Sequence, residues 1–459
     1  MKRTVSILLS GVLLFSVVSC GGQATTKESE LESNVTSQPE SSELEAPKEP
    51  ENPSKVIRLA YGYDGGTWTK ARKNWLEQSA QTWEYNGVTI ELEQTGYDGE
   101  EGPSAILSAR QAGQTPPDIT LFMSQDLHVF LNGNSGSLYQ PIDQYLSDYP
   151  EWEDGSFYPI AQEFCRYQDK TYGVPFSMYS YGILWYRKDI LEQAGIADFA
   201  PKTWEELLEY LKVIQKNSPD VLPLWYNNNP YAFSSLLRAH GGSFRGEDGK
   251  FLTGSEVIEQ SLNCYSDLKE LGIEPEEDDH TEYSFEQGNL AIHLSSSSGY
   301  GQYLTDDTET VPEYYHRLGF MPIPPREGIK SETPCDVGGE CFLVTYESGN
   351  PRAAVDFIMH CMKPENYGPV ICRMKAVSVC PEMIKQEEYQ KLEGKSDLTE
   401  IIANGKLDEL DSEYIKQVNA VWDMVKRVVD DGMAPKDAME QFRKDMNLYF
   451  KEDELSEEK

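Results

Sequence analysis

The order of apolar segments in the first third of the chain constrains the fold more than any other feature of the sequence. Val56–Ala60 is a short, mainly apolar run typical of a buried strand, and a Gly-rich stretch separates it from a helix expected over residues 69–83. Residues 88–92 then alternate between apolar and polar side chains, residues 104–112 predict a second helix, and Ile119–Met123 is another apolar run. This succession of strand, helix, strand, helix and strand is typical of a parallel sheet with helices on its faces.

The same alternation continues through the middle of the chain. Residues 182–186 predict a strand, and the helix expected after it, over residues 188–194, ends at Gly195. Thr203–Glu206 has the spacing of a capping box, which predicts a long amphipathic helix through Lys216. The remaining expected elements are a helix face at 257–268, strands at 290–294, 319–322 and 342–344, a helix capped by Asn350 with Pro351 at its first position, and helices near 412–430 and 435–450.

These elements place the chain in the α/β class. Residues 56–450 are too many for one hydrophobic core and match two lobes of average domain size. We therefore expect an α/β protein of two lobes.

The first twenty residues have the pattern of a secretory signal. A basic start is followed by an apolar run from Val5 to Val18 and by small residues before Cys20. Residues 4–19 are shorter than the roughly 20 residues of a membrane-spanning helix. The Cys at the cleavage position resembles the lipobox of bacterial lipoproteins. That resemblance implies that residues 1–19 are a removed signal peptide and that Cys20 is lipidated, which anchors the protein to the outer face of the cytoplasmic membrane.

Residues 21–55 have the composition of a tether. They consist largely of Glu, Ser, Thr, Pro and Lys and contain no aromatic residue. Such a segment cannot bury enough apolar surface to fold, so we expect a disordered acidic spacer. Residues 451–459 form a second acidic segment at the other end of the sequence.

The charge balance excludes one class of partner. The chain has 77 Asp and Glu residues against 40 Lys and Arg, and its net charge is −37. A surface of this sign repels nucleic acids and anionic lipid headgroups, so we expect no nucleic-acid partner.

The Cys and His residues do not have the spacing of a metal site. Seven Cys remain besides Cys20, an odd number, and none belongs to a C-x-x-C pair. Cys335 with Cys341, or Cys372 with Cys380, could pair in an oxidising compartment, and the sequence leaves this open. We expect neither a metal nor a cofactor.

Four segments, taken in order, resemble the extracellular solute-binding proteins of ABC importers, in particular the sugar-binding group that includes maltose-binding protein. They are Tyr172–Pro175 with Leu184–Asp189, the helix start Pro201–Glu206, the segment Phe285–Ile292, and Gly338-Gly339 followed by Asn350 and Ala353–Phe357. The resemblance covers residues 56 to about 450. It implies a type II periplasmic-binding-protein-like fold, in which two lobes close on a ligand by bending at a hinge.

The resemblance also implies where the lobes begin and end. The chain is expected to cross between them at 172–177, 294–298 and 375–379. Lobe one would then contain residues 56–172 and 300–374, and lobe two residues 176–294 and 380–450.

Candidate ligand contacts follow from the chemistry of sugars and from the same resemblance. A sugar-binding site needs aromatic rings that stack on the C–H faces of the sugar and polar side chains that hydrogen-bond its hydroxyls. Tyr179 stands where maltose-binding protein has a Glu, and Asn229 replaces another Glu, so the ligand need not be maltose. For Trp68, Trp225 and Tyr231, packing is as good an interpretation as ligand contact, and Arg373 could instead bond a neighbouring carboxylate. The candidates are Asp64, Trp68, Asp126, Tyr179, Trp225, Asn229, Tyr231, Ser298, Tyr300, Asp336, Gly338, Gly339, Arg373 and Trp422.

The function that the resemblance implies is non-enzymatic: a monomeric receptor captures a carbohydrate and delivers it to an ABC permease. A peptide or polyamine ligand is an alternative, as is a sensor subunit that signals to a membrane kinase. An exported enzyme is a further alternative, but the sequence has no G-x-S-x-G, H-E-x-x-H or P-loop motif to support it.

Overall fold

The computed structural model describes most of the chain after the tether. The described residues are 47–62, 67–95, 101–124, 127–131, 137–246, 248–275, 283–297, 313–330, 335–372, 377–391, 393–407 and 414–456. The expectations for the signal peptide, for Cys20 and for most of the tether lie outside these residues.

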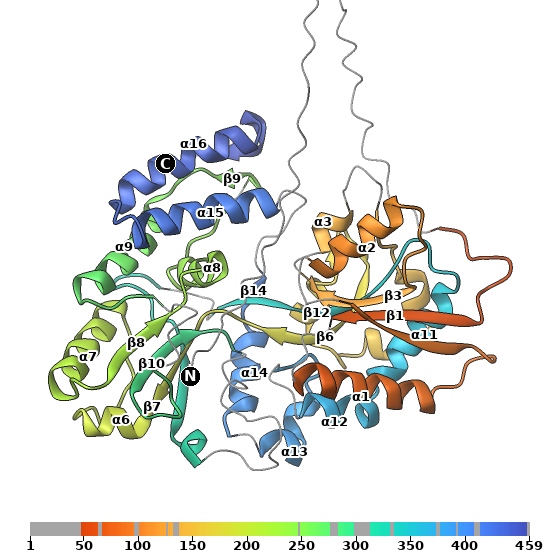
Figure 1. Ribbon diagram of the computed structural model, residues 1–459, viewed down its shortest axis with the longest axis horizontal. Helices are drawn as coiled ribbons and strands as arrows, with labels where there is room; N and C mark the ends of the chain where they lie inside the picture. Colours follow the sequence, from red (N-terminus) through yellow and green to blue (C-terminus); the bar gives the residue numbers. More distant parts are fainter. Residues whose placement is uncertain are drawn as a thin grey trace, which may run out of the picture. The chain divides into compact units, whose positions relative to one another are not determined.

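The first sheet is built around the predicted parallel unit. Strand β1 (Val56–Gly62) pairs in parallel with β2 (Thr89–Thr95) on one side and with β3 (Ile119–Met123) on the other, as Figure 1 shows. Helices α1 (Thr67–Thr82) and α2 (Glu101–Gln111) connect these strands. The sequence expectation for this region is confirmed.

Antiparallel strands extend this sheet beyond the parallel unit. Strand β12 (Asp336–Val344) pairs antiparallel with β3 and with β6 (Gly173–Tyr179), and β13 (Val377–Ser378) pairs antiparallel with β6. The short strand β14 (Lys406–Leu407) pairs with β12 in parallel. The first sheet is therefore mixed. Helices α11 (Pro351–Cys361), α12 (Pro364–Ile371) and α14 (Lys395–Ala403) pack on the same core.

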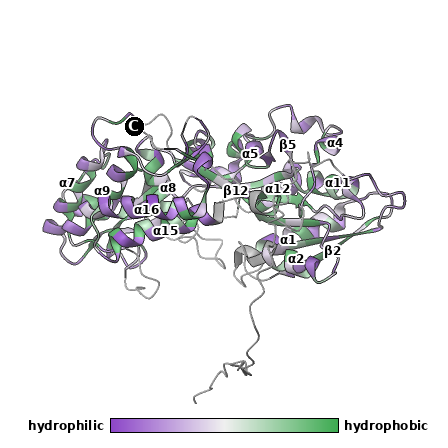
Figure 2. Ribbon diagram, turned by 90° about the horizontal axis from the view of Figure 1, so that it is seen from above, coloured by the Kyte–Doolittle hydropathy of each residue, from purple (hydrophilic) through white to green (hydrophobic). Residues whose placement is uncertain are grey.

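A second sheet has the strand order β11-β7-β10-β8. Its strands are β7 (Ile183–Arg187), β8 (Leu222–Tyr226), β10 (Leu290–Ser295) and β11 (Leu318–Pro322). Its helices are α6 (Lys188–Gln193), α7 (Trp204–Asn217), α8 (Pro230–Ala239), α9 (Glu256–Glu270), α15 (Tyr414–Val429) and α16 (Pro435–Tyr449). In Figure 2, α7, α9 and α16 carry both hydrophilic and hydrophobic residues, as expected of helices with one buried face.

Short elements complete the described part of the chain. They are α3 (Leu127–Leu131), α4 (Asp143–Leu146), α5 (Pro159–Glu163), β4 (Arg166–Tyr167), β5 (Lys170–Thr171), β9 (Phe251–Leu252), α13 (Glu387–Gln390), β15 (Leu455–Ser456) and five-residue or shorter 3₁₀ turns at Pro150–Trp152, Glu313–Arg317, Met383–Lys385 and Glu452–Glu454.

The predicted helix starts are confirmed in their main features. The Thr203 hydroxyl accepts a hydrogen bond from the backbone N–H of Glu206 at 3.2 Å, and the Asn350 side chain accepts one from Ala353. The Glu206 carboxylate, however, accepts from the N–H of Lys202 rather than of Thr203, so the reciprocal half of the capping box is shifted by one residue.

All three expected crossings between the lobes need correction. Strand β6, which was expected to contain the first crossing at 172–177, pairs with β12 in the first sheet up to Tyr179. Strand β11 was expected in lobe one, but it pairs with β7 of the second sheet because its backbone completes that sheet's open edge. Residues 380–407 were expected in lobe two, but Tyr389, Leu398 and Ile402 are buried in the core of the first sheet. The chain therefore passes from β6 to β7 near residues 180–182, returns between β11 and β12, and leaves the first core for α15 after β14.

The seven thiols in the described residues are all free and buried, so neither Cys335–Cys341 nor Cys372–Cys380 is a disulfide. In the same part of the chain, no three or more His, Cys, Asp or Glu side chains gather as a metal site would require. None of the described helices has the length and apolar character needed to cross a bilayer.

Candidate ligand-binding site

The candidate site lies where the first crossing meets both sheets. Strand β6 ends at Tyr179, β7 begins at Ile183, and the residues between them connect the two sheets. Helix α8 follows β8, and β12 begins at Asp336. The described candidates that meet here are Tyr179 at the end of β6, Tyr231 on α8, and three residues of β12, namely Asp336, Gly338 and Gly339.

Three tyrosines form an aromatic row at this point. The ring of Tyr181 stacks on that of Tyr231, with centroids 5.1 Å apart and an angle of 20° between planes. The ring of Tyr179 meets Tyr181 edge to face at 5.6 Å. All three residues are partly exposed.

Two of the predicted glycines have packing roles beside this row. A Cβ on residue 338 would come within 2.7 Å of the Tyr179 ring, so Gly338 makes room for that ring. A Cβ on residue 339 would collide with the Phe164 ring and the carbonyl oxygen of Ser177. Both glycines permit close packing of β12 on its neighbours.

Asp336 is buried, with an exposed fraction of 5%. Its Oδ1 accepts hydrogen bonds from the Ser180 hydroxyl at 3.0 Å and from the Ser235 hydroxyl. We call these three residues the Asp336 junction, because they join the first crossing, α8 and β12.

Other candidates lie elsewhere or have a visible structural role. Asn229 caps α8, its side-chain oxygen accepting from the N–H of Ala232 at 2.9 Å. The Trp225 ring lies beside that of His293, with centroids 5.7 Å apart. Trp422 is 41% exposed on α15, with the Lys426 ammonium 3.9 Å from its ring centroid.

Several candidates cannot be placed. Trp68 belongs to α1, but its side chain is outside the described part of the structure. Asp64, Asp126, Ser298, Tyr300 and Arg373 also lie outside the described residues.

Sequence reasoning missed Tyr181. The alternation Tyr179-Ser180-Tyr181 was visible in the sequence, but the partner ring of Tyr181 lies on a helix that begins 49 residues later in the chain. Only the fold brings the two rings together.

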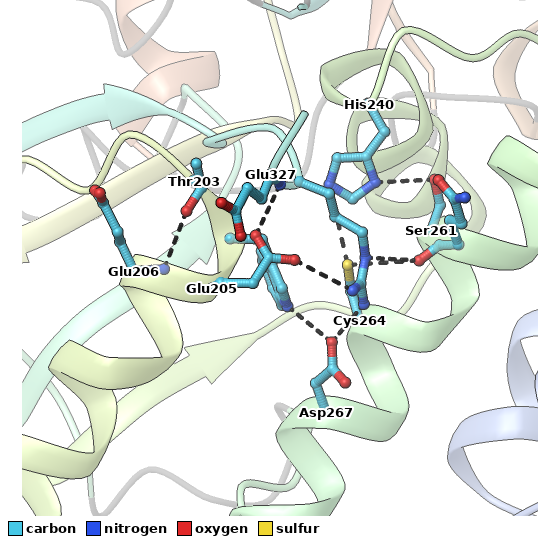
Figure 3. Close-up of polar contacts among 11 residues, drawn as sticks. Thr203, Glu205, Glu206, His240, Ser261, Cys264, Asp267 and Glu327 are labelled. Atoms are coloured by element: carbon cyan, nitrogen blue, oxygen red, sulfur yellow. Dashed lines mark hydrogen bonds and ion pairs between the residues drawn. The ribbon is translucent and has the colours of Figure 1, made fainter. Parts of the chain in front are cut away.

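A second polar cluster, around Arg326 in the loop after β11, brings a cysteine and a histidine together (Figure 3). The Arg326 guanidinium bonds the carboxylates of Asp267 and Glu205 and the carbonyl oxygen of Gln260. Beside it, His240 bonds the Ser261 hydroxyl at 3.0 Å, and the Cys264 sulfur lies 4.0 Å from its other ring nitrogen. We call this set the Arg326 cluster.

The Arg326 cluster does not have the electrostatics of a nucleophilic site. Burial raises the pKa of the Cys264 thiol far above its ordinary value, despite the opposing effect of Arg326. Burial and the charge of Arg326 lower the pKa of His240 to about 4, so the imidazole is neutral near pH 7. A reactive cysteine needs a depressed thiol pKa and access. This cluster therefore serves packing: it holds the loop after β11 against α7 and α9.

Comparison with known proteins extends these observations to the whole fold. The family model for bacterial extracellular solute-binding protein matches residues 52–367. An arabinooligosaccharide-binding protein of Halalkalibacterium halodurans is 22% identical over 309 residues, which are 64% of this chain and 66% of that protein. A maltotriose-binding protein of Pyrococcus abyssi is 26% identical over 31% of this chain and 28% of its own length. The matched segments thus span 66% or less of these relatives.

Solved structures agree with the expected fold. The GacH receptor of Streptomyces glaucescens has a TM-score of 0.70 at 16% identity, covering 86% of this chain and 99% of its own. Maltose-bound MalE3 of T. maritima also scores 0.70, at 18% identity, covering 86% of this chain and all of its own. These likenesses show the maltose-binding-like type II periplasmic-binding-protein fold.

Proposed function

The chain belongs to the family of bacterial extracellular solute-binding proteins, and from this premise we propose that it captures a carbohydrate of oligosaccharide size and delivers it to an ABC permease. Proteins of this family and fold are generally non-enzymatic.

The observation that carries the proposal is the row of Tyr179, Tyr181 and Tyr231. Partly exposed rings offer the flat apolar surface that the C–H faces of a sugar need, and sugar sites combine such surfaces with a few polar groups. The relatives named for arabinooligosaccharide and maltotriose, and the neighbouring structure solved with acarbose, support the same ligand class.

The position of the row suggests how ligand capture would be signalled. Tyr179 directly precedes the first crossing, Tyr181 lies within it, and Tyr231 belongs to a helix of the second sheet. A ligand on these rings would touch the segment that must bend when two lobes close. Closure follows only where the ligand stabilises the closed state more than the open one, and the closed form is what a permease would recognise.

We further propose that the protein is a lipoprotein anchored through Cys20, with residues 21–55 as a spacer that keeps it near the permease. The chemistry of the first twenty residues supports this, since a basic start and an apolar run precede the cysteine. Cys20→Ser should abolish incorporation of a labelled fatty acid without changing ligand affinity. Labelling that persists in this variant would exclude Cys20 as the anchor.

The ligand class is tested by thermal unfolding of the full-length Cys20→Ser chain with maltotriose, arabinotriose, a tripeptide or spermidine. A ligand at about 100 times its Kd stabilises the folded state by about 2.7 kcal/mol. We expect an increase in Tm with at least one sugar, and Tyr231→Ala should abolish it without lowering the Tm of the free protein by as much as a core substitution. A Tm increase with spermidine or the tripeptide and with neither sugar would replace the carbohydrate assignment.

A further inference from the structure

Asp336 was expected to contact the ligand, but its surroundings indicate a different role. It is the first residue of β12 and is almost fully buried. A single carboxylate oxygen, Oδ1, accepts the hydroxyl hydrogen bonds of both Ser180 and Ser235. This one oxygen atom of β12 therefore bonds both the first crossing and α8.

The first crossing is also hydrogen-bonded to Ser297, which follows β10. The N–H of Ser180 donates to the Ser297 hydroxyl at 3.0 Å, and the N–H of Ser297 donates to the carbonyl oxygen of Ser180 at 2.6 Å. The Ser180 hydroxyl also accepts from the N–H of Gly182 at 3.2 Å. A Cβ on residue 182 would lie 2.9 Å from the Cβ of Ser235, so the crossing and α8 approach closely at this point.

The same two elements carry the stacked ring pair. Tyr181 directly follows Ser180 in the chain. Tyr231 precedes Ser235 by four residues in α8, a spacing that places both side chains on one face of the helix. The hydroxyl–carboxylate bonds and the Tyr181–Tyr231 stack are therefore neighbouring contacts between the crossing and α8.

We propose that Asp336 is a positioning residue, which holds the Tyr181–Tyr231 pair in its stacked geometry by anchoring both Ser180 and Ser235 to the start of β12, and thereby sets the affinity of the site. The inference rests on the proposed function, because it concerns the rings that would meet the sugar. Hydrogen bonds to a buried carboxylate are stronger than neutral ones, and removing one donor leaves that carboxylate less well solvated. Loss of either hydroxyl would release one ring from its anchor.

The test compares the loss of a hydroxyl at the Asp336 junction with the loss of a hydroxyl elsewhere in the second core. Ser235→Ala in the full-length chain should weaken binding of maltotriose or arabinotriose by about tenfold, the effect expected for a lost hydrogen bond to a charged group. Asp336→Asn should lose less, because the amide oxygen can still accept at the Oδ1 position. Affinity is measured by isothermal titration calorimetry.

Ser261→Ala is the matched control. Its hydroxyl donates to the carbonyl oxygen of Val257 at 2.8 Å and bonds His240, within the core of the second sheet. This variant should lose unfolding free energy comparable to that lost by Ser235→Ala but retain wild-type affinity. Equal affinity losses in both variants would mean that general destabilisation weakens binding, which overturns the proposal.

A measurement without ligand separates this inference from the proposed function. Hydrogen–deuterium exchange of the free protein should be faster at residues 180–183 and 231–236 in Ser235→Ala and unchanged there in Ser261→Ala. If the wild type binds neither sugar, the carbohydrate proposal fails, while faster exchange confined to these segments still supports the anchoring role. Unchanged exchange in Ser235→Ala overturns that role whichever ligand binds.

Discussion

The Arg326 cluster and the Asp336 junction are both polar networks, but they join different parts of the molecule. Arg326 links a loop to α7 and α9, all of which pack on the second sheet. Asp336 begins a strand of the first sheet and bonds the crossing and a helix of the second. The first network consolidates one core, whereas the second ties two cores together.

The two networks also differ in the side chains that form them. At the centre of the Arg326 cluster, one guanidinium bonds two carboxylates and a carbonyl oxygen, an arrangement that demands a fixed geometry. The Asp336 junction uses two short hydroxyls that can rotate about one acceptor oxygen. A junction of this kind can keep its bonds through small changes of angle, which suits the bending proposed for the first crossing. Unfolding free energy and ligand affinity, measured on substituted proteins, distinguish side chains that stabilise one core from side chains that affect the site.

The largest expected effect is on the stability of the second core. Arg326→Ala removes the bonds to Asp267, Glu205 and Gln260, and leaves a partly buried carboxylate without its cation. We expect a loss of about 2 kcal/mol in unfolding free energy, less than for a fully buried pair because these groups stay partly exposed, measured by urea denaturation, with ligand affinity unchanged.

Arg317→Ala is the matched control for that substitution. Arg317 pairs with Asp189 and Glu313 at an exposed position, where such pairs contribute no more than about 1 kcal/mol. A loss in Arg326→Ala no greater than in Arg317→Ala would show that the cluster does not consolidate the core.

The next effect concerns a buried amine in the first core and depends on pH. Lys395 is fully buried, donates to the carbonyl oxygen of Ile371 at 2.6 Å and lies over the Tyr389 ring. Burial lowers its pKa to about 7, against a small opposing effect of Cys372. Between pH 7 and the ordinary pKa of 10.5 the unfolded chain holds this proton more readily, so Lys395 destabilises the folded state increasingly as the pH falls toward 7.

Lys395→Met removes that titration. The unfolding free energy of the variant minus that of the wild type should fall as pH rises from 7 to 9, by up to about 1.4 kcal/mol per pH unit. Urea denaturation at three pH values measures it, and the subtraction cancels the titration of the buried thiols. A difference that does not vary with pH would mean that Lys395 keeps its proton in the folded state up to pH 9, which contradicts a pKa of about 7.

A smaller effect on ligand affinity should distinguish α8, which carries Tyr231, from α11, which has an equivalent N-cap in the first core. Asn229→Ala and Asn350→Ala each remove an N-cap, from α8 and α11, and each should cost about 1 kcal/mol of unfolding free energy. We expect only Asn229→Ala to weaken sugar binding, by several-fold, because its helix holds a ring of the site. Titration calorimetry of both variants measures the difference, and equal affinities would mean that the start of α8 does not position the ring.

The smallest effect on stability is expected at Trp422. Its indole is exposed on α15 and contacts the Lys426 ammonium, so Trp422→Ala should change the unfolding free energy by less than about 0.5 kcal/mol. If this ring contributes to the site, as predicted from the resemblance, sugar affinity falls several-fold in the same variant. Unchanged affinity would limit the aromatic surface of the site to the tyrosine row.

Local features of the fold were predictable because their causes are local. Thr203 and Asn350 cap the helices that their spacing indicated, and Gly195, with φ of +89°, ends α6 where a left-handed residue is needed. The parallel order of β1, β2 and β3 followed from short connections through single helices.

Contacts between distant segments were not predictable in the same way. Nothing near β11 in sequence indicates that it pairs with β7, and residues 380–407 join the first core through side chains whose partners lie far away in the chain. Asp336 was predicted as a ligand contact from the sequence, but its bonds to Ser180 and Ser235 span 156 and 101 residues and could not be predicted.

The α/β class, the helix starts, the thiols without metal spacing and the resemblance that identifies the family all follow from the amino-acid sequence. These depend on periodicity, on capping chemistry and on short motifs, all of which act within about a dozen residues of the chain. The folded chain was needed to show which tyrosines form a row, which glycines make room for rings, and that a buried carboxylate joins the two cores. Those outcomes depend on how strands far apart in sequence pair and cross, a choice made by the packing of whole sheets rather than by any one segment.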